Sequence, residues 1–263
     1  MLFLLSPAKT LDYESPMPAG LARRATLPRY VDEAAALIDV LRERSVPEIA
    51  ELMSLSDPLA TLNVQRYADW SREFTARNSR PAALAFNGDV YEGLQAASLG
   101  TADWTWAQRH VVILSGLYGL LRPLDRLQPY RLEMGTRLAS PGGAKDLYAY
   151  WGDKLAHALN DEQAGEKSPI IVNLASQEYS RAALRPALRA RVVECVFEEW
   201  HGGQWKVISF FAKRARGLMA RHAIQQRAST LKALRAFDAE GYAFDDEVSD
   251  ADRFVFRRRA AAA

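Results

Sequence analysis

Charged and polar side chains stand at or just after the ends of several predicted strands, where they would suit phosphate binding or acid–base chemistry. These residues are Lys9, Asn87, Asp89, Arg131, Glu133, Asn173, Ser176, Glu178 and Lys213. Because the polar ends of parallel strands meet at one edge of a sheet, we expect this set to converge on one cleft. The carboxylates Asp89, Glu133 and Glu178 are groups that general acid–base catalysis or a metal would use. The alternative is that they orient the neighbouring arginines by ion pairing.

A second candidate site is the loop that follows the apolar run at 111–114. Arg122, Arg126 and Arg131 lie within ten residues there, among prolines and tyrosines. Three guanidinium groups in one ordered loop repel one another unless an anion is present, which indicates an anion-binding surface. Gly116, at the end of the run, allows the backbone to turn or to approach another group closely. The alternative is an irregular loop whose prolines and tyrosines pack on the core.

The segment from His201 to Phe237 contains eight Lys or Arg residues and no Asp or Glu. Its pattern predicts a helix from 213 to about 227. At about 100° per residue, one broad arc of this helix carries Lys213, Arg214, Arg216, Arg221 and Arg227. The side predicted to face the core carries Phe211, Ala215, Leu218 and Met219. A solvated helix face normally mixes acids with bases, so the absence of acids favours contact with a polyanion over a merely solvated face.

Residues 46–70 are similar to a helix-hairpin-helix DNA-binding element. Predicted helices at 46–53 and 59–77 enclose Ser54, Leu55, Ser56 and Asp57, and Arg66 lies on the second helix. Such a hairpin points backbone N–H groups at a phosphate, which holds DNA without reading its sequence. Serines stand where the generic hairpin has two glycines. The alternative is an ordinary corner between two helices, with Ser56 or Asp57 as an N-cap.

The bulk composition is that of an ordinary globular protein, with 263 residues, 49% hydrophobic and 25% charged. The formal net charge is only +2, so any affinity for nucleic acid must come from local patches. Cys195 is the single cysteine and lies in an apolar run, which predicts a buried thiol and excludes an internal disulfide. The apolar start at 2–5 lacks the flanks of a signal peptide, and no run approaches the roughly 18 apolar residues of a membrane span. We therefore expect a cytoplasmic protein without membrane association.

The fold that must position these residues is predicted to be of the α/β class, with mixed α+β character. Strands are predicted at 2–5, 82–86, 111–115, 169–174, 191–197 and 204–211, with a closing strand at 253–259. Helices are predicted at 28–44, 46–53, 59–77 and 144–160. The first four strands alternate with helical patterns, as in a parallel sheet, whereas Gly202-Gly203 joins the next two as in an antiparallel hairpin. We expect a single compact domain over residues 1–263, with a mixed, partly parallel sheet flanked by helices.

Several common site motifs are absent from the sequence. The four histidines are scattered without metal-binding spacing, so a zinc site is not expected. No nucleophile elbow or dinucleotide-binding glycine motif is present, and the loop bearing Lys9 lacks the glycines of a Walker A loop. We therefore predict neither a metal nor a cofactor.

Six longer motifs together resemble one known family. They read SPAKTLD at 6–12, FNGDVYEGL at 86–94, ILSGLYGLLRPLD at 113–125, QPYRLEMGTRL at 128–138, NLASQEY at 173–179 and AKRARGLMAR at 212–221. They are similar to the bacterial YaaA family of peroxide-stress proteins over nearly the whole chain. The resemblance implies a cytosolic protein with a mixed α/β fold peculiar to the family, and DNA binding through a positively charged cleft and a helix-hairpin-helix element. It also implies protection of DNA from oxidative damage and a link with limiting intracellular free iron.

We therefore predict a DNA-binding protein of the peroxide-stress response. It would hold duplex or branched DNA with little sequence specificity, and DNA-repair proteins are further expected partners. The expected phosphate-binding residues are Lys9, Ser54, Leu55, Ser56, Asp57, Arg66, Arg122, Arg131, Lys213, Arg214, Arg216 and Arg221.

Two rival hypotheses stay open at this point. One is an enzyme acting on a nucleotide or another phosphorylated small molecule, with Lys9, Asp89, Glu133 and Glu178 as catalytic candidates. Carboxylates gathered in a deep pocket would favour the enzyme, and a wide basic groove would favour DNA. The other is a stress protein that acts through a protein partner, with its basic face merely solvated.

Overall fold

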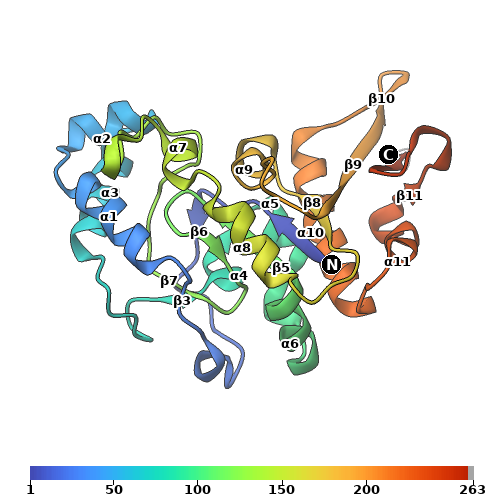
Figure 1. The fold of residues 1–263 in the computed structure, drawn as a ribbon, viewed down its shortest axis with the longest axis horizontal. Helices are drawn as coiled ribbons and strands as arrows, with labels where there is room; N and C mark the ends of the chain where they lie inside the picture. Colours follow the sequence, from blue (N-terminus) through green and yellow to red (C-terminus); the bar gives the residue numbers. More distant parts are fainter. Residues whose placement is uncertain (260–263) are drawn as a thin grey trace.

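The computed structural model describes residues 1–259, and its centre is an eight-stranded mixed sheet (Figure 1). The strand order is β11-β12-β9-β8-β1-β5-β6, with β10 beside β9. Neighbouring parallel strands form the middle, namely β12 (Arg253–Arg258), β9 (Arg191–His201), β8 (Ile170–Leu174), β1 (Leu2–Leu5) and β5 (Val111–Ser115). Antiparallel strands complete it, namely β6 (Gly119–Leu121), β10 (Gln204–Lys206) and β11 (Ala243–Phe244). The predicted α/β class with a mixed, partly parallel sheet is confirmed.

The central strands are buried on both faces, as their uninterrupted apolar runs predict. Every residue of β1 and β5 is buried. One face of the sheet is covered by α5 (Asp89–Leu94), α6 (Thr101–His110) and α10 (Ser209–Gln226), and the other by α8 (Lys154–Glu162) and α9 (Gln177–Ala183) (Figure 1). The buried apolar residues of the described chain form one continuous cluster. The parallel strands therefore share a single core.

Three helices form one end of the molecule, away from the β9–β12 end (Figure 1). They are α1 (Val31–Arg42), α2 (Val46–Met53) and α3 (Asp57–Asp69). The bounds of α2 are those predicted, because a capping box of Ser45 and Glu48 starts the helix, with Pro47 in its first turn. Two small antiparallel pairs lie outside the main sheet, β2 (Thr10–Leu11) with β4 (Phe86–Asn87) and β3 (Arg80–Pro81) with β7 (Arg126–Leu127).

The strand predicted over 82–86 is wrong. Ala82–Ala85 forms a short helix, α4, and only Phe86–Asn87 is extended, in the pair with β2. The segment consists of alanine and leucine up to Phe86, and both residue types favour a helix over a strand. It is apolar because it is buried, and burial alone does not distinguish a short helix from a strand.

Other element boundaries also differ from the predictions. The strand predicted at 204–211 ends at Lys206, and α10 begins at Ser209. The helix predicted at 144–160 is two helices, α7 (Leu147–Trp151) and α8, separated at Gly152. The antiparallel hairpin of β9 and β10 is present as predicted. The remaining helix, α11 (Leu231–Arg235), lies within the acid-free segment.

Two glycines allow the close backbone approaches that shape the functional edge. A Cβ at Gly217 of α10 would lie 1.8 Å from the carbonyl oxygen of Val90, so α5 and α10 cross at a distance that only glycine permits. A Cβ at Gly116 would lie 2.3 Å from the carbonyl oxygen of Leu132. The close approach predicted at Gly116 therefore holds the segment around Leu132 against the end of β5.

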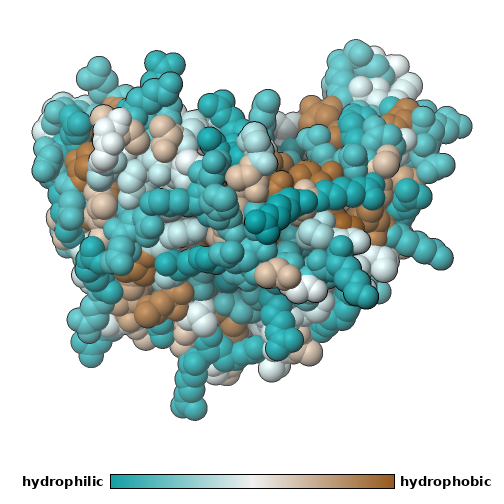
Figure 2. All heavy atoms as spheres, viewed as in Figure 1, coloured by the Kyte–Doolittle hydropathy of each residue, from teal (hydrophilic) through white to brown (hydrophobic). Residues whose placement is uncertain are grey.

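The surface seen in Figure 2 is mostly hydrophilic, with smaller apolar patches, some of them toward the end that carries β9 and β10. Exposed apolar side chains from this region are Trp200, Val207, Phe210 and Phe211. Phe211 was predicted to face the core and is instead 37% exposed, in the first turn of α10. Within residues 1–259, no helix is long and apolar enough to cross a bilayer.

Candidate functional site

A cavity of about 310 Å³ lies at the carboxyl ends of β1 and β8, and we call it the strand-end cavity. Its lining comes from the loop at 6–10 after β1, from 87–91 at the start of α5, from 130–133, from Ser176, Glu178 and Tyr179 at the start of α9, and from Lys213 and Arg216 of α10. After β1, the next strand of the main sheet along the chain is β5, which lies on one side of β1. After β8, the next strand is β9, which lies on the opposite side. Such a reversal of direction leaves a crevice between the two strand ends, where ligands of α/β proteins bind.

Hydrogen bonds tie the segments around the cavity together. The backbone N–H of Ser176 donates to Oγ of Ser6 at 2.8 Å, and Oγ of Ser6 donates to Oγ of Ser176 at 3.2 Å. The hydroxyl of Tyr91 donates to the carbonyl oxygen of Ser6 at 3.0 Å. These bonds fix the loop after β1 against both α9 and α5, so the two sides of the cavity are held in register.

The fold gathers most of the polar strand-end set around this cavity. The residues that line it are Lys9, Asn87, Asp89, Arg131, Glu133, Ser176, Glu178 and Lys213. Asn173 does not line it, because its side chain is buried and Oδ1 accepts a hydrogen bond from the N–H of Ala175 at 3.0 Å. The chemical role of the eight residues that line the cavity stays a prediction.

Two of the three carboxylates are paired with cations inside the cavity. Glu133 lies 2.9 Å from Nζ of Lys9 and 3.1 Å from Nη2 of Arg131. Asp89 lies 3.9 Å from Nζ of Lys213. These distances agree with the alternative in which the carboxylates orient the cations.

The third carboxylate, Glu178, is held differently. Its Oε1 accepts a hydrogen bond from the backbone N–H of Gly135 at 2.9 Å, and no Lys, Arg or His of residues 1–259 lies within 4.0 Å of it. Arg216 is its counterpart among the cations, since the described part of the chain offers its guanidinium no hydrogen bond or ion pair. Burial lowers the pKa of Arg216, and the charge of Glu194 opposes that effect. The cavity thus contains one unmatched carboxylate and one unmatched guanidinium.

Sequence reasoning missed the tyrosines that form the neutral part of the wall. Tyr91, Tyr130 and Tyr179 line the cavity, and burial raises the pKa of each hydroxyl, so all three are neutral at physiological pH. The hydroxyl of Tyr130 shares a hydrogen bond of 2.6 Å with Oγ of Ser115. The motifs FNGDVYEGL and NLASQEY contain two of them, but nothing in a single sequence shows that their rings face one space.

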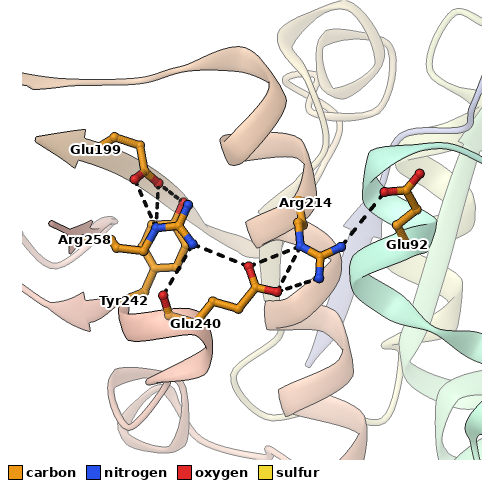
Figure 3. Close-up of polar contacts among 6 residues, drawn as sticks. All are labelled: Glu92, Glu199, Arg214, Glu240, Tyr242 and Arg258. Atoms are coloured by element: carbon orange, nitrogen blue, oxygen red, sulfur yellow. Dashed lines mark hydrogen bonds and ion pairs between the residues drawn. The ribbon is translucent and has the colours of Figure 1, made fainter. Parts of the chain in front are cut away.

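The basic helix is largely neutralised by the rest of the molecule. Arg214 pairs with Glu240 at 2.5 Å and lies 3.9 Å from Glu92 (Figure 3). The hydrogen bonds that Arg214 donates to the Glu240 carboxylate raise the pKa of Arg214. Arg227 pairs with Asp103 at 2.7 Å. The acids missing from the local sequence are therefore supplied by α5, by α6 and by the 3-10 turn Ala239–Gly241.

Arg221 also lies outside the strand-end cavity. Its Nη1 donates to the carbonyl oxygens of Leu94 and Gln95 at 3.1 Å and to Oγ of Ser98 at 2.8 Å. Only Lys213 and Arg216 of the predicted arc reach the cavity. A free basic face along the whole helix is therefore a wrong prediction, because α5 packs on part of that arc at Gly217.

Arg214 belongs to a longer chain of ion pairs (Figure 3). Arg258 of β12 contacts Glu199 of β9 at 3.0 Å and Glu240 at 3.4 Å, and the hydroxyl of Tyr242 donates to Glu199. Figure 3 shows these side chains pointing toward one another from β9, β12, α10 and α5. The chain connects the C-terminal strand to the helix that carries Lys213 and Arg216.

The arginines of the loop after β5 have separate partners. Arg122 pairs with Glu162 and donates to the carbonyl oxygen of Val111 at 3.2 Å, so it lies at the start of β5 and does not line the cavity. Arg126 donates to the carbonyl oxygen of Ala22 at 3.2 Å. Only Arg131 reaches the strand-end cavity. Different protein groups thus hold the three arginines apart from one another.

The corner between α2 and α3 has the predicted helices, but the DNA-binding hairpin is not confirmed. The N–H groups of Ser54 and Leu55 donate to carbonyl oxygens of α2, at 3.3 Å and 2.9 Å, so they are not free for a phosphate. Ser56 is the N-cap of α3, which begins at Asp57. Arg66 is partly buried and donates to Oδ1 of Asn63 at 3.3 Å.

Cys195 is buried on β9, as predicted. Burial raises the pKa of its thiol to about 12, so the reactive thiolate is scarce at neutral pH. In residues 1–259, no three His, Cys, Asp or Glu side chains are grouped as metal ligands.

The chain is similar to known bacterial proteins over nearly its whole length. The family model described as peroxide stress protein YaaA matches residues 1–248. A UPF0246 protein of Bordetella avium is 62% identical over 259 residues, which cover 98% of this chain and 99% of the relative. UPF0246 proteins of Paracidovorax citrulli and Leptothrix cholodnii are 61% and 60% identical over 261 residues, covering 99% of this chain and 100% of each relative.

Proposed function

The chain belongs to the peroxide stress protein YaaA family, and from this premise we propose that it protects against peroxide damage by binding DNA through phosphate contacts at the strand-end cavity. The observation that supports this proposal is the convergence of four cations, Lys9, Arg131, Lys213 and Arg216, on one cavity. They come from three separate segments of the chain, since Lys213 and Arg216 share α10, so their proximity is a property of the fold. Phosphate contacts from such groups supply most of the sequence-independent affinity for DNA.

The charge balance of the cavity favours an anion. Four cations and three carboxylates, Asp89, Glu133 and Glu178, leave a formal excess of one positive charge (4 − 3 = +1). Arg216 contributes that excess, because no carboxylate of the described chain lies within 4.0 Å of its guanidinium and Glu194 acts on it only at longer range. An anionic ligand could therefore bind Arg216 without breaking an existing ion pair.

The exposed cations would make the outer contacts with the DNA backbone. The side chains of Lys9 and Lys213 are 64% and 53% exposed, and each is held near the cavity by a carboxylate. Ammonium groups of this kind contact phosphates as point charges and read no base sequence. Binding should therefore tolerate different sequences and weaken as salt rises.

The remaining predicted DNA contacts belong to this proposal as a second surface. The backbone N–H groups of Ser56 and Asp57 at the start of α3, and the guanidinium of Arg66, would contact further phosphates of the same DNA. The family resemblance extends the proposal to cooperation with DNA-repair proteins and to limiting free iron. A strain lacking the protein should then show more iron detectable by electron paramagnetic resonance under peroxide than the complemented strain, and equal signals would contradict this part.

The test of DNA binding is fluorescence anisotropy with labelled duplex and branched DNA over a salt series. The variant Lys9→Glu/Lys213→Glu reverses the two exposed cavity cations. The control Lys145→Glu/Lys167→Glu makes the same charge change at exposed lysines outside the cavity. We expect the cavity variant to lose about tenfold or more in affinity and the control to lose much less, because only the cavity variant loses phosphate contacts. Each lost contact should also lower the slope of log affinity against log salt by about 1.

Equal losses in both variants, with circular dichroism unchanged, would show that only net charge matters and would contradict the proposed site. No binding by the unaltered protein even at low salt would overturn DNA binding altogether.

A second candidate function is an enzyme that acts on a nucleotide or another phosphorylated small molecule. The observation that favours it is the presence of Asp89, Glu133 and Glu178 in the same bounded cavity, where phosphate clamping alone does not need them. Turnover of nucleotides and phosphosugars followed by phosphorus NMR would test it. Activity that disappears in Glu178→Gln would support the enzyme, and a full screen without turnover would exclude it for those substrates.

A further inference from the structure

The strand-end cavity has the size of a site for one small molecule. Its volume of about 310 Å³ lies at the lower end of the range of roughly 300–1,000 Å³ that is typical of small-ligand pockets. A DNA duplex is wider than its own major groove, which is about 12 Å across, and so does not enter such a space. Whatever fills the interior is therefore a single unit of a longer strand or a free small molecule.

The lining divides into a charged part and a neutral aromatic part. Lys213 and Arg216 present cations from α10, whereas Tyr91, Tyr130 and Tyr179 present neutral rings. Cations suit a phosphate, and aromatic rings suit the flat face or edge of a base or the apolar face of a sugar. The two parts together fit a molecule that has both a phosphate and a ring system.

The two unmatched groups specify the ligand further. In the described chain Arg216 donates no hydrogen bond and has no carboxylate within 4.0 Å, and the charge of Glu194 acts on it only at longer range. Its guanidinium can therefore still donate directly to an oxyanion. Glu178 has no cationic partner there, and an ionised carboxylate only accepts hydrogen bonds. The bond from the Gly135 N–H at 2.9 Å positions Glu178 and occupies only one of its acceptor sites. A matching ligand therefore carries an anion for Arg216 and a hydroxyl or N–H donor for Glu178.

We propose that the strand-end cavity binds a single phosphorylated nucleoside, with its phosphate at Arg216 and Lys213 and a sugar hydroxyl or base N–H at Glu178. This inference rests on the proposed function, in that DNA would supply the unit as a terminal or unstacked nucleotide. Inserting a nucleotide requires that it leave the base stack, and this is easiest at an end, a mismatch or a single-stranded segment. The protein should therefore prefer DNA with ends or unpaired nucleotides to an uninterrupted duplex.

The first test is isothermal titration calorimetry with the four deoxynucleoside 5′-monophosphates, with inorganic phosphate and with deoxyadenosine. The variants Arg216→Gln and Glu178→Gln remove one charge each, and Glu178→Gln also preserves the volume of the side chain. Arg214→Gln is the control, because its guanidinium lies on the same helix but pairs with Glu240 outside the cavity. We expect each cavity variant to weaken monophosphate binding about tenfold or more and the control to leave it within about twofold, as for loss of a charge-assisted hydrogen bond.

Arg216 is partly buried, so Lys213→Gln provides a second, exposed variant if Arg216→Gln does not fold. The Lys213→Gln variant should also weaken monophosphate binding, since the ammonium of Lys213 is expected to contact the same phosphate as Arg216. Inorganic phosphate that binds as tightly as the monophosphates, with no effect of Glu178→Gln, would reduce the site to an anion site and overturn the nucleoside assignment. Deoxyadenosine alone should bind more weakly than its monophosphate.

The second test separates this inference from DNA binding itself. Labelled DNA with a 5′-phosphorylated overhang is compared with a relaxed, covalently closed circular duplex, which has neither ends nor unpaired nucleotides, with and without competing monophosphate. Tighter binding of the overhang, displaced by monophosphate, supports the inference. Equal binding of both DNAs without displacement overturns it and leaves DNA binding intact. Monophosphate binding with no binding of either DNA overturns the proposed DNA function and assigns the cavity to a free nucleotide.

Discussion

Asp125 is a carboxyl group that the fold buries and supplies with hydrogen bonds. Its Oδ2 accepts from the N–H of Arg122 at 2.7 Å, and Oδ1 accepts from the hydroxyl of Thr26 at 2.6 Å. Burial raises the pKa of Asp125 from 3.8 to about 6, against the effect of these bonds. The protonated form is therefore favoured more strongly in the folded protein than in the unfolded chain.

This shift gives stability a defined dependence on pH. The folded pKa lies above the unfolded one, so the contribution of Asp125 to stability is fully present below about pH 4 and is lost as pH rises through about 6. In Asp125→Asn the side chain stays neutral. We expect the stability of the natural protein relative to Asp125→Asn to fall by about 3 kcal/mol between pH 3 and pH 7, at about 1.4 kcal/mol for each unit of pKa shift.

Urea unfolding of both proteins at several pH values measures that difference. The comparison cancels the pH dependence of all other groups, because both proteins share them. A difference that stays constant with pH would show that the pKa of Asp125 is the same in the folded and unfolded states.

At the scale of elements, the crossing of α5 and α10 decides the shape of the strand-end cavity. Asp89 begins α5, and Lys213 and Arg216 lie on α10, so the distance between the helices sets the separation of these charges. Gly217 meets the Val90 carbonyl at this crossing, and Gly93 of α5 approaches the Arg214 carbonyl in the same way. Neither backbone oxygen can move without moving its helix.

We therefore expect Gly217→Ala to destabilise the protein strongly. The new Cβ would lie 1.8 Å from a backbone oxygen, so the helices must separate, and overpacking of this kind costs about 3 kcal/mol or more. Gly165→Ala is the matched control, because nothing lies within 4 Å of a Cβ there. Urea unfolding monitored by circular dichroism gives both values, and a loss for Gly217→Ala no larger than that of the control would contradict the close crossing.

At the scale of the whole molecule, the ion chain of Figure 3 joins α10 to the segments that precede and follow it in the sequence, namely β9 on one side and the turn Ala239–Gly241 with β12 on the other. Glu199 of β9 is almost fully buried, with a side chain that is 5% exposed, and its cationic partner Arg258 comes from the C-terminal strand. Through Glu240 and Arg214 the same chain reaches α5. A substitution in β12 that breaks this chain should therefore lower the stability of the whole protein.

The variant Arg258→Met tests this connection. Among residues 1–259 it leaves the buried carboxylate of Glu199 only the Tyr242 hydroxyl as a side-chain donor, and such removal of one partner costs about 3–5 kcal/mol. Arg29→Met removes one side of an exposed pair with Asp161 and should cost about 1 kcal/mol or less. Thermal unfolding of both variants provides the measurement, and similar small losses would show that the Glu199–Arg258 pair is not structurally important.

The sequence by itself determined the features that depend on short stretches of chain. The uninterrupted apolar runs predicted β1, β5 and β8, and Ser45, Pro47 and Glu48 fixed the start of α2, because strand burial and helix capping involve neighbouring residues. The same local patterns placed polar residues at strand ends, and parallel strands bring their ends together. Six long motifs were enough to indicate the family.

Only the tertiary structure decided which charges are free. The acid-free helix looked basic because Glu240, the partner of Arg214, lies 26 residues away and Asp103, the partner of Arg227, lies 124 residues away. Arg122 likewise pairs with a residue distant in the sequence, Glu162, and does not line the cavity. Ion pairs and cavities depend on contacts between distant segments, which a local pattern does not contain. For that reason Arg216 and Glu178 could be singled out as the unmatched pair only after the sheet, α9 and α10 were in place.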